Sequence, residues 1–514
     1  MRYGFVIDQT QCIGCHACTV ACKAEHEIPL GAFRTWVTYT ETGTFPDSRR
    51  HFQVNRCNHC ENAPCVAICP TGALFRRPDG IVDFDKSKCI GCKACIAACP
   101  YDAIYIDPDD HTAAKCNFCA HRVDSGLEPA CVVVCPTHSI WVGDLDDPRS
   151  GISRLISERP TAVRSPEQNT HPNVFYLGAD RVALDPLEAP VDSSYIYSRP
   201  DRQRLEFSQG VGERPPEAAR TTLNTAHPRP WGWRVSTYLW TKSVATGALL
   251  TAALALLFGA RTGPETELLA PSVALLFSVL TGILLIWDLK RPERFYFLFL
   301  KFNPTSWLVW GTFAFGLYSL LSATWLGLGA LTASGVLPAG AARLAFGVLP
   351  WVALPVGVVT AGYSAMLFNQ AEGRDLWQSP IFFWHLLVQA IMAGSGGLVL
   401  LGLLTTTTSA EVRFLLTCLV VAAALHLLLL ALEHVGQHPS RQAATAARLM
   451  ILGPYAREFW LGAVAAPILA IGLASFAIPG AIAAVGALAG VLVQPGLLAY
   501  ETAFVRAGQD VPLS

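Results

Sequence analysis

Sixteen of the seventeen cysteines in this 514-residue chain crowd into its first 135 residues, and the exception, Cys418, lies in an apolar run. They form four groups of four, which follow the spacings C-x2-C-x2-C-x3-C, C-x2-C-x4-C-x3-C, C-x2-C-x2-C-x3-C and C-x2-C-x11-C-x3-C. In order, the groups are Cys12, Cys15, Cys18, Cys22; Cys57, Cys60, Cys65, Cys69; Cys89, Cys92, Cys95, Cys99; and Cys116, Cys119, Cys131, Cys135. Sets of soft thiolate ligands suit zinc or iron–sulfur clusters.

The spacing favours iron–sulfur clusters over zinc. The run C-x2-C-x2-C-x3-C-P, complete at Cys89 to Pro100, is typical of [4Fe–4S] sites, and its fourth cysteine binds the partner cluster. A single C-x2-C pair would also suit zinc. Four quartets, three of them followed by proline, indicate four [4Fe–4S] clusters with all sixteen cysteines as ligands. No quartet lacks a cysteine, so no three-iron site is expected.

Disulfides are the other explanation for crowded cysteines. They belong to secreted proteins, whereas the opening MRYGFVIDQTQCIGC has neither an apolar signal region nor a twin arginine. We therefore expect reduced thiolates in an intracellular compartment. Three histidines beside the cysteines, His16, His59 and His121, are expected near the clusters or at the surface rather than on iron.

The composition divides the chain in two. With 38 basic and 39 acidic residues, the chain lacks the basic excess of a nucleic-acid binder. Residues 1–230 are polar and charged, and residues 231–514 supply most of the 52% hydrophobic content. This contrast predicts at least two domains.

The second half contains eight long apolar runs, each near or above the ~20 residues that cross a bilayer as a helix. They cover about 236–260, 267–288, 304–331, 342–368, 380–404, 411–433, 457–478 and 480–504. Buried helices of a soluble protein are the alternative, but eight such runs argue against it. Barrel strands would alternate in polarity, which these runs do not.

We therefore predict an α+β, double bis-cluster ferredoxin-like head fused to an all-α bundle of eight transmembrane helices. The head covers residues 1–150 and the membrane domain covers 231–514. Residues 151–230, rich in Pro, Arg, Glu and Ser, are predicted to form an extended tail or linker against another subunit, with plain disorder as the alternative.

Basic residues predict which side of the membrane the head occupies. With the head inside, nine lie in or beside inner loops and three in or beside outer ones, which favours a cytoplasmic head on the inner (cytoplasmic) membrane. The basic residues of the inner loops are Lys290, Arg291, Arg294, Lys301, Arg374, Arg441, Arg448, Arg457 and Arg506. Those of the outer loops are Arg261, Arg343 and Arg413.

The head resembles the four-cluster ferredoxin subunit of molybdopterin oxidoreductases, the group of dimethyl sulfoxide, polysulfide and tetrathionate reductases and sulfite dehydrogenases. The resemblance covers about residues 1–180 and rests on CIGCHACTVACK, RCNHCENAPCVAICPTGAL, CIGCKACIAACPYDA and KCNFCAHRVDSGLEPACVVVCPT. It implies that the first motif pairs with the fourth and the second with the third. The implied ligand sets are Cys12/Cys15/Cys18/Cys135, Cys116/Cys119/Cys131/Cys22, Cys57/Cys60/Cys65/Cys99 and Cys89/Cys92/Cys95/Cys69.

The membrane half resembles the NrfD-type anchor of the same complexes. The resemblance rests on DLKRPERF at 288–295, NPTSWLVWGTF from Asn303, and the ending RAGQDVPLS. Where this chain has Lys290, the family phrase usually has glycine. The resemblance implies eight helices that bind a quinone, without haem, and that exchange electrons with the ferredoxin part. The alternative interpretation is that the charges of DLKRPER only cap an inner loop and have no part in a quinone site.

Ionisable and aromatic groups in the apolar runs are candidates for a quinone site, because quinone chemistry moves two protons with two electrons. The candidates are Tyr238, Lys242, Asp288, Tyr363 and His385, with the site favoured near Lys242 and Asp288 on the cluster side. For each candidate, the alternative to a quinone-site role is a structural salt bridge or a position at the membrane interface. His385 and His426 are the only histidines considered for haem, and they are far apart in sequence.

The sequence thus predicts an electron-transfer and membrane-anchor subunit. It would connect the quinone pool to a separate catalytic subunit with a bis-pterin molybdenum or tungsten cofactor. Two alternatives are a proton-translocating module of a respiratory complex, and a cluster-bearing sensor or assembly scaffold.

Overall fold

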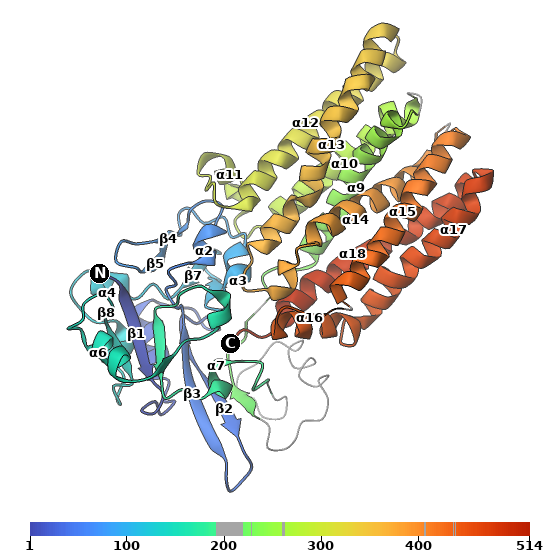
Figure 1. Cartoon of the computed structure of the whole chain (residues 1–514). Helices are drawn as coiled ribbons and strands as arrows, with labels where there is room; N and C mark the ends of the chain where they lie inside the picture. Colours follow the sequence, from blue (N-terminus) through green and yellow to red (C-terminus); the bar gives the residue numbers. More distant parts are fainter. Residues whose placement is uncertain (192–218, 228, 260–262, 406–407, 435, 437) are drawn as a thin grey trace.

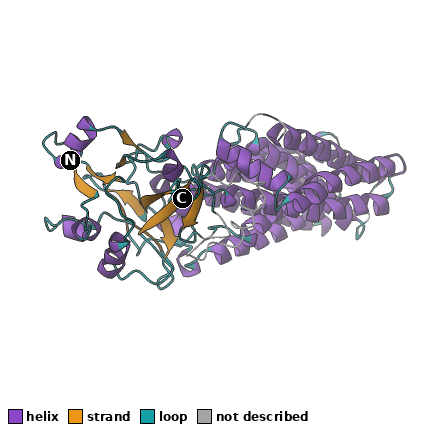
Figure 2. Ribbon diagram, turned by 90° about the horizontal axis from the view of Figure 1, so that it is seen from below, coloured by secondary structure: helices purple, strands orange, loops and turns teal. Residues whose placement is uncertain are grey.

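The computed structural model describes residues 1–191, 219–227, 229–259, 263–405, 408–434, 436 and 438–514. These residues form an elongated molecule with a mixed head at one end and a helical bundle at the other (Figure 1 and Figure 2). The ferredoxin-type head and the predominantly helical second half confirm the predicted fold class.

The head is built on two small sheets. The first has the strand order β8-β1-β10-β9, formed by Ile140–Asp144, Tyr3–Asp8, Val174–Leu177 and Thr161–Ala162. The second has the order β11-β2-β3, formed by Arg220–Leu223, Thr35–Thr42 and Arg49–Arg56. Strand β1 is apolar and buried, and it pairs parallel to β10 and antiparallel to β8.

The cysteine loops lie between short helices and two small hairpins. The hairpins are β4–β5 (Leu74–Arg76, Val82–Phe84) and β6–β7 (Ile104–Ile106, Ala113–Lys115). The helices are α1 (Ala17–Glu25), α2 (Pro64–Ala67), α3 (Ala94–Ala98), α4 (Ala120–Val123), α5 (Ala130–Val133), α6 (Gly151–Glu158) and α7 (Arg181–Leu184). α1 packs against α5, and α2 packs against α3.

The predicted linker over residues 151–230 is wrong at both of its described ends, and its last part contains strand β11 of the second sheet. Helix α6 packs on β8 and β1, and strand β10 lies inside the first sheet. The apolar residues of β10 complete the buried face of that sheet, so the folded head extends at least to Leu177. Residues 192–218 of the predicted linker lie outside the described part of the chain.

Eight helices in the described residues are long and apolar enough to cross a membrane, as predicted. They span Trp233–Leu257, Glu265–Asp288, Trp307–Ala333, Ala339–Asn369, Phe382–Gly402, Ser409–His434, Glu458–Gly480 and Ala483–Asp510. In chain order these are α9, α10, α12, α13, α14, α15, α17 and α18. Two spans begin with a π-helical segment: Glu265–Leu269 before α10 (Ala270–Asp288), and Glu458–Ala465 before α17 (Ala466–Gly480). Two shorter helices, α11 (Phe297–Leu300) and α16 (Arg441–Ile451), lie between them.

Helix α9 is the centre of the bundle and packs against α10, α13, α14 and α18. It crosses α14 where Gly247 meets Gly394, and a Cβ atom on Gly247 would lie 1.7 Å from the Ala390 carbonyl oxygen. Such close contact of backbones is the typical way for helices to associate in lipid, where small residues allow dispersion contacts.

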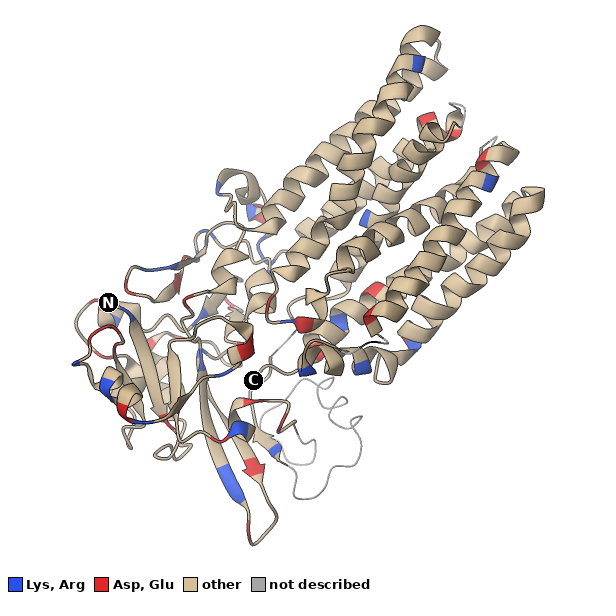
Figure 3. Cartoon of the chain, viewed as in Figure 1, with Lys and Arg blue, Asp and Glu red and all other residues tan. Residues whose placement is uncertain are grey.

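Charged residues are concentrated in the head and at the ends of the helices, and few lie along the bundle (Figure 3). Burying charge in hydrocarbon is costly, so this distribution fits a bundle surrounded by lipid. The chain is therefore an integral membrane protein with its head at one end of the bundle.

We predict that Gly247→Ala destabilises the bundle by about 3 kcal/mol, because the new methyl group must push α9 away from α14. Thermal unfolding of the purified protein in detergent measures the change. Gly282→Ala in α10 is the control, because a Cβ atom there meets nothing within 4 Å. Equal melting temperatures for the two variants would contradict the proposed crossing.

Candidate functional site

The structure gathers the sixteen motif cysteines into four sets. Three sets each line one small cavity in the head, and each joins three cysteines of one motif to the last cysteine of another. These sets are Cys12, Cys15, Cys18 with Cys135; Cys57, Cys60, Cys65 with Cys99; and Cys89, Cys92, Cys95 with Cys69. In the fourth, Cys22 interacts with Cys116, Cys119 and Cys131.

This crossing follows from how the short helices pack. Because α1 lies on α5 and α2 lies on α3, the last cysteine of each motif faces the partner motif. The pairing of motifs is the one that the family resemblance implied. We name the four groups by position: the outer set (with Cys12), the second set (with Cys116), the third set (with Cys57) and the inner set (with Cys89).

The sets follow one another from the outer head to the bundle. Cys18 of the outer set interacts with Cys131 of the second. Cys116 of the second interacts with Cys57 of the third, and Cys95 of the inner set interacts with Cys65 of the third. Figure 1 shows α2 and α3, which carry cysteines of the third and inner sets, on the side of the head that faces the bundle.

The surroundings of these sulfurs fit bound metal–sulfur groups. Burial raises the pKa of Cys99 to about 12, so a thiolate forms there only when a metal ion replaces the proton. Backbone amides donate to the sulfurs of Cys135 (from Ser139, 3.3 Å) and Cys89 (from Gly91, 3.4 Å). Hydrogen bonds of this kind stabilise anionic sulfur.

Two residues beside the sulfurs were not predicted from the sequence. The guanidinium of Arg56 donates to Cys131 Sγ at 3.2 Å, and His26 Nε2 lies 3.2 Å from Cys119 Sγ. Burial lowers the pKa of His26 to about 4, so this imidazole is neutral near pH 7. Arg56 directly precedes Cys57 and His26 follows Cys22 by four residues, but only the fold brings them to Cys131 and Cys119.

The inner set is held by the membrane half. Backbone carbonyls of three of its four cysteines accept hydrogen bonds from bundle residues: Cys69 from Asn303 Nδ2 (2.9 Å), Cys89 from Arg294 Nη1 (2.9 Å) and Cys92 from Trp231 Nε1 (3.3 Å). Ordering these carbonyls fixes the loop that positions the sulfurs. The loops between α10 and α12 and before α9 are therefore part of the inner set's environment.

The DLKRPERF stretch contacts the inner set directly, rather than serving only as a charged inner loop. The amides of Lys290 and Arg291 donate to the carbonyls of Gly91 (3.1 Å) and Ile90 (3.2 Å). Gly91 has φ +68°, and a Cβ atom there would lie 2.6 Å from Lys290 Cβ. A glycine is therefore required where the two loops meet.

Two further ion pairs join the head to the bundle. Arg374, after α13, pairs with Asp102 at 3.2 Å, and both side chains are almost fully buried. The same guanidinium donates to the carbonyls of Gln509 and Val511 at the end of the chain. Lys93, inside the third motif, pairs with Asp288 at the end of α10 at 2.7 Å.

A cavity of about 660 Å³ lies at this junction, beside the inner set. Its apolar walls include Phe33, Ile96 and Trp233, and its polar groups include Lys93 and Asp288. A cavity of this size with a few convergent polar groups is typical of small-molecule sites. Of the five candidate quinone residues, only Asp288 lines it.

Three other candidates, Tyr238, Lys242 and Tyr363, meet deeper in the bundle. Lys242 Nζ donates to the Ala361 carbonyl (2.7 Å) and Ser364 Oγ (2.8 Å) and lies 5.1 Å from the centre of the Tyr363 ring. Tyr238 interacts electrostatically with Tyr363 and more weakly with Asp288.

The fifth candidate, His385, lies apart from them in a separate polar network. Its imidazole is 2.9 Å from a carboxylate oxygen of Glu433 and 2.9 Å from His426, with the Tyr500 hydroxyl at 3.4 Å. His385 and His426, far apart in sequence, are thus in direct contact between α14 and α15. Glu501 lies near Lys242, and both of its carboxylate oxygens are buried without a hydrogen-bond partner in the described structure.

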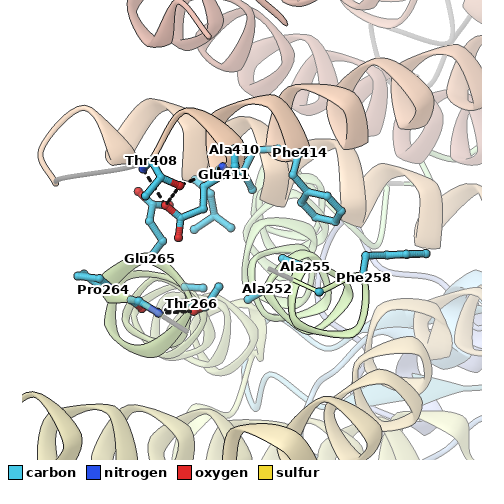
Figure 4. Close-up of a pocket in the computed structure, with 15 residues that line it drawn as sticks. Ala252, Ala255, Phe258, Pro264, Glu265, Thr266, Thr408, Ala410, Glu411 and Phe414 are labelled. Atoms are coloured by element: carbon cyan, nitrogen blue, oxygen red, sulfur yellow. Dashed lines mark hydrogen bonds between the residues drawn. The ribbon is translucent and has the colours of Figure 1, made fainter. Parts of the chain in front are cut away.

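A second cavity, of about 720 Å³, lies at the opposite end of the bundle (Figure 4). Small and apolar side chains of α9, α14 and α15 line it, together with Glu265, Thr266, Thr408 and Glu411. Glu265 accepts a hydrogen bond from Thr405 at 2.9 Å, and Glu411 accepts two from Thr408 at 2.7 Å. No pattern in the sequence predicted this cavity.

Two family models match the chain. Residues 221–511 match "Polysulphide reductase, NrfD", and residues 49–145 match "4Fe-4S dicluster domain". The first covers more than half of the chain and contains every predicted membrane helix.

Several known proteins are similar to the head. A tetrathionate reductase subunit of Salmonella typhimurium is 45% identical over 190 residues, which is 36% of this chain and 76% of that protein. A polysulfide reductase chain of Wolinella succinogenes is 41% identical over 187 residues, 36% of this chain and 98% of that one. Protein NrfC of Escherichia coli K12 is 44% identical over 178 residues, 34% of this chain and 80% of that one.

We predict that Arg374→Met lowers the stability of the protein by about 3–5 kcal/mol, because it leaves the Asp102 carboxylate buried without this cation. Thermal unfolding in detergent measures the loss, and the double variant Arg374→Met/Asp102→Asn should recover part of it. Arg291→Met is the control, since the Glu293 carboxylate it pairs with is 57% exposed. A melting temperature for Arg374→Met as high as that of the control would refute the prediction.

Proposed function

This protein belongs to the NrfD family, joined to an iron–sulfur electron-transfer head, and we propose that it carries electrons between the quinone pool and a separate molybdopterin catalytic subunit. The membrane half anchors it, and the homologous heads are subunits of oxidoreductase complexes. The observation that carries the quinone link is the junction cavity, which lies directly beside the inner cysteine set.

The sixteen motif cysteines bind four [4Fe–4S] clusters in this proposal, one for each set. When bound, such clusters take up and release single electrons. The four sets form an unbroken series from the junction to the outer head. Asn303, Arg294 and Trp231 hold the loops of the inner set in place.

The quinone headgroup occupies the junction cavity. Lys93 has a buried ammonium that can donate a hydrogen bond to a quinone oxygen, and the Asp288 carboxylate can hold the proton that a quinol releases. Tyr238, Lys242 and Tyr363 lie behind Asp288 and offer the next polar groups for that proton. His385 and Glu433 are farther along the bundle and serve proton movement rather than headgroup binding.

The catalytic subunit docks on the outer head. Cys15 of the outer set is exposed there, and Ile13 and Val20 beside it are 58% and 65% exposed. Apolar side chains around an exposed redox site suit a protein contact. The names of the two reductase relatives, a tetrathionate reductase subunit and a polysulfide reductase chain, support the assembly of this protein with further polypeptides.

The head lies on the cytoplasmic side of the inner membrane in this proposal. Its support is the excess of basic residues in the loops that contact the head, such as Lys290, Arg291 and Arg294.

Anaerobic addition of a reduced quinol analogue to the purified protein tests the proposal. We expect the quinol to reduce the clusters, followed by EPR and visible absorbance, and a quinone-site inhibitor to block the reaction. Cys95→Ser should slow quinol-driven reduction of the remaining clusters, while dithionite still reduces them. If the clusters are intact but never exchange electrons with quinol or quinone, the quinone-linked function is contradicted and the sensor or scaffold function is favoured.

Asp288→Asn should slow quinol-driven reduction by about 10²-fold, because the amide cannot take the quinol proton. Glu293→Gln is the matched control, since it removes a carboxylate that is 57% exposed in the following loop. Stopped-flow absorbance measures both rates at saturating quinol. Similar rates for the two variants would exclude Asp288 from the proton transfer.

A further inference from the structure

Two cations are buried in the head between successive cysteine sets. Arg56, at the end of β3, is 1% exposed, and Lys115, at the end of β7, is 0% exposed. Neither forms an ion pair with a carboxylate in the described part of the chain. Arg56 interacts with cysteines, Lys115 Nζ donates to the carbonyls of Val82 and Cys116, and both cations interact with the buried His59. A buried charge without a counter-charge is strongly unfavourable, so both positions require an anion nearby.

Arg56 lies between the outer and second sets. Its Nη1 donates to Cys131 Sγ at 3.2 Å, and its guanidinium also interacts with Cys116 and Cys18. Its Nε and Nη2 groups are buried and have no hydrogen-bond partner in the described structure. The guanidinium carbon also lies over the Phe5 ring, 4.4 Å from its centre, but a cation–π contact cannot replace full hydration of the charge.

Lys115 lies between the second and third sets. Its ammonium interacts with Cys116 of the second set and Cys65 of the third. Each cation is therefore shared by two neighbouring sets, and the second set is the one that contacts both.

We propose that Arg56 and Lys115 are potential-setting residues, each of which raises the reduction potentials of the two clusters on either side of it. The inference rests on the proposed ligation of a cluster by each cysteine set. A cluster bound by four thiolates becomes more negative when it gains an electron, so a fixed positive charge in a dry interior favours the reduced form. Because each cation lies beside two sets, it favours the reduced form of both clusters.

Redox titration of the cluster-loaded full chain, followed by EPR, tests the proposal. The signals are first assigned with Cys18→Ser, Cys131→Ser and Cys65→Ser. We expect Arg56→Gln to disfavour reduction of the outer and second clusters about tenfold, which is about 59 mV for a one-electron step. Lys115→Gln should shift the second and third clusters by a similar amount, so that only the second responds to both changes.

Arg56→Lys and Arg154→Gln are the controls. Arg56→Lys retains the charge and should restore most of the shift, whereas Arg154 is exposed on α6, and its change should leave all four potentials as they are. Iron and sulfide content is measured for each variant. Unchanged potentials with full iron content, or equal shifts of all four clusters, would overturn the proposal.

Loss of iron in both Arg56→Gln and Lys115→Gln would also overturn it, because the cations would then serve only to retain the clusters. Mediators and dithionite set the potential in these titrations, so no quinone takes part. A failure here is therefore distinguishable from a failure of the quinone-linked function.

Discussion

The head depends on one constraint: sulfur that carries negative charge must be kept out of water and close to its neighbours. Most of the sixteen motif cysteines are buried, and the polypeptide around them supplies compensating donors. Backbone amides, the Arg56 guanidinium and the Lys115 ammonium lie beside the sets. The short helices and hairpins of the head are too small to be stable by themselves, and the cysteine sets lie at the points where they meet.

The same constraint shapes the membrane half. An eight-helix bundle that only anchored the head would need no contact with a particular cysteine loop. Here the loops before α9 and between α10 and α12 supply hydrogen bonds to three cysteine carbonyls of the inner set, and the loop after α13 supplies the cation for Asp102. The junction is thus a continuous polar interface. The family phrase DLKRPERF lies at its centre because its backbone pairs with the loop around Gly91.

The sequence predicted features that depend on local spacing. The crossed cysteine sets follow from motif spacing together with the family pairing, and the eight helices follow from run length alone. Strand β10 was missed because VFYL is only four residues long and follows a polar stretch, so its partner β1 decides its structure. The contact between His385 and His426 could not be predicted, because it depends on the packing of α14 against α15. Arg56 directly precedes Cys57 in the sequence, but its contact with Cys131 of another motif depends on the fold and could not be predicted.

The hydrogen bonds from Trp231, Arg294 and Asn303 to the inner set have a consequence for how the protein matures. These bundle residues cover the loops of Cys69, Cys89 and Cys92 once the two halves are docked. In the proposed ligation, the loops that hold the inner cluster therefore reach their final positions only when the head docks on the bundle. Because both halves are one polypeptide, the bundle is present beside every newly made head, and the order of insertion, loading and docking becomes a step that the cell has to control.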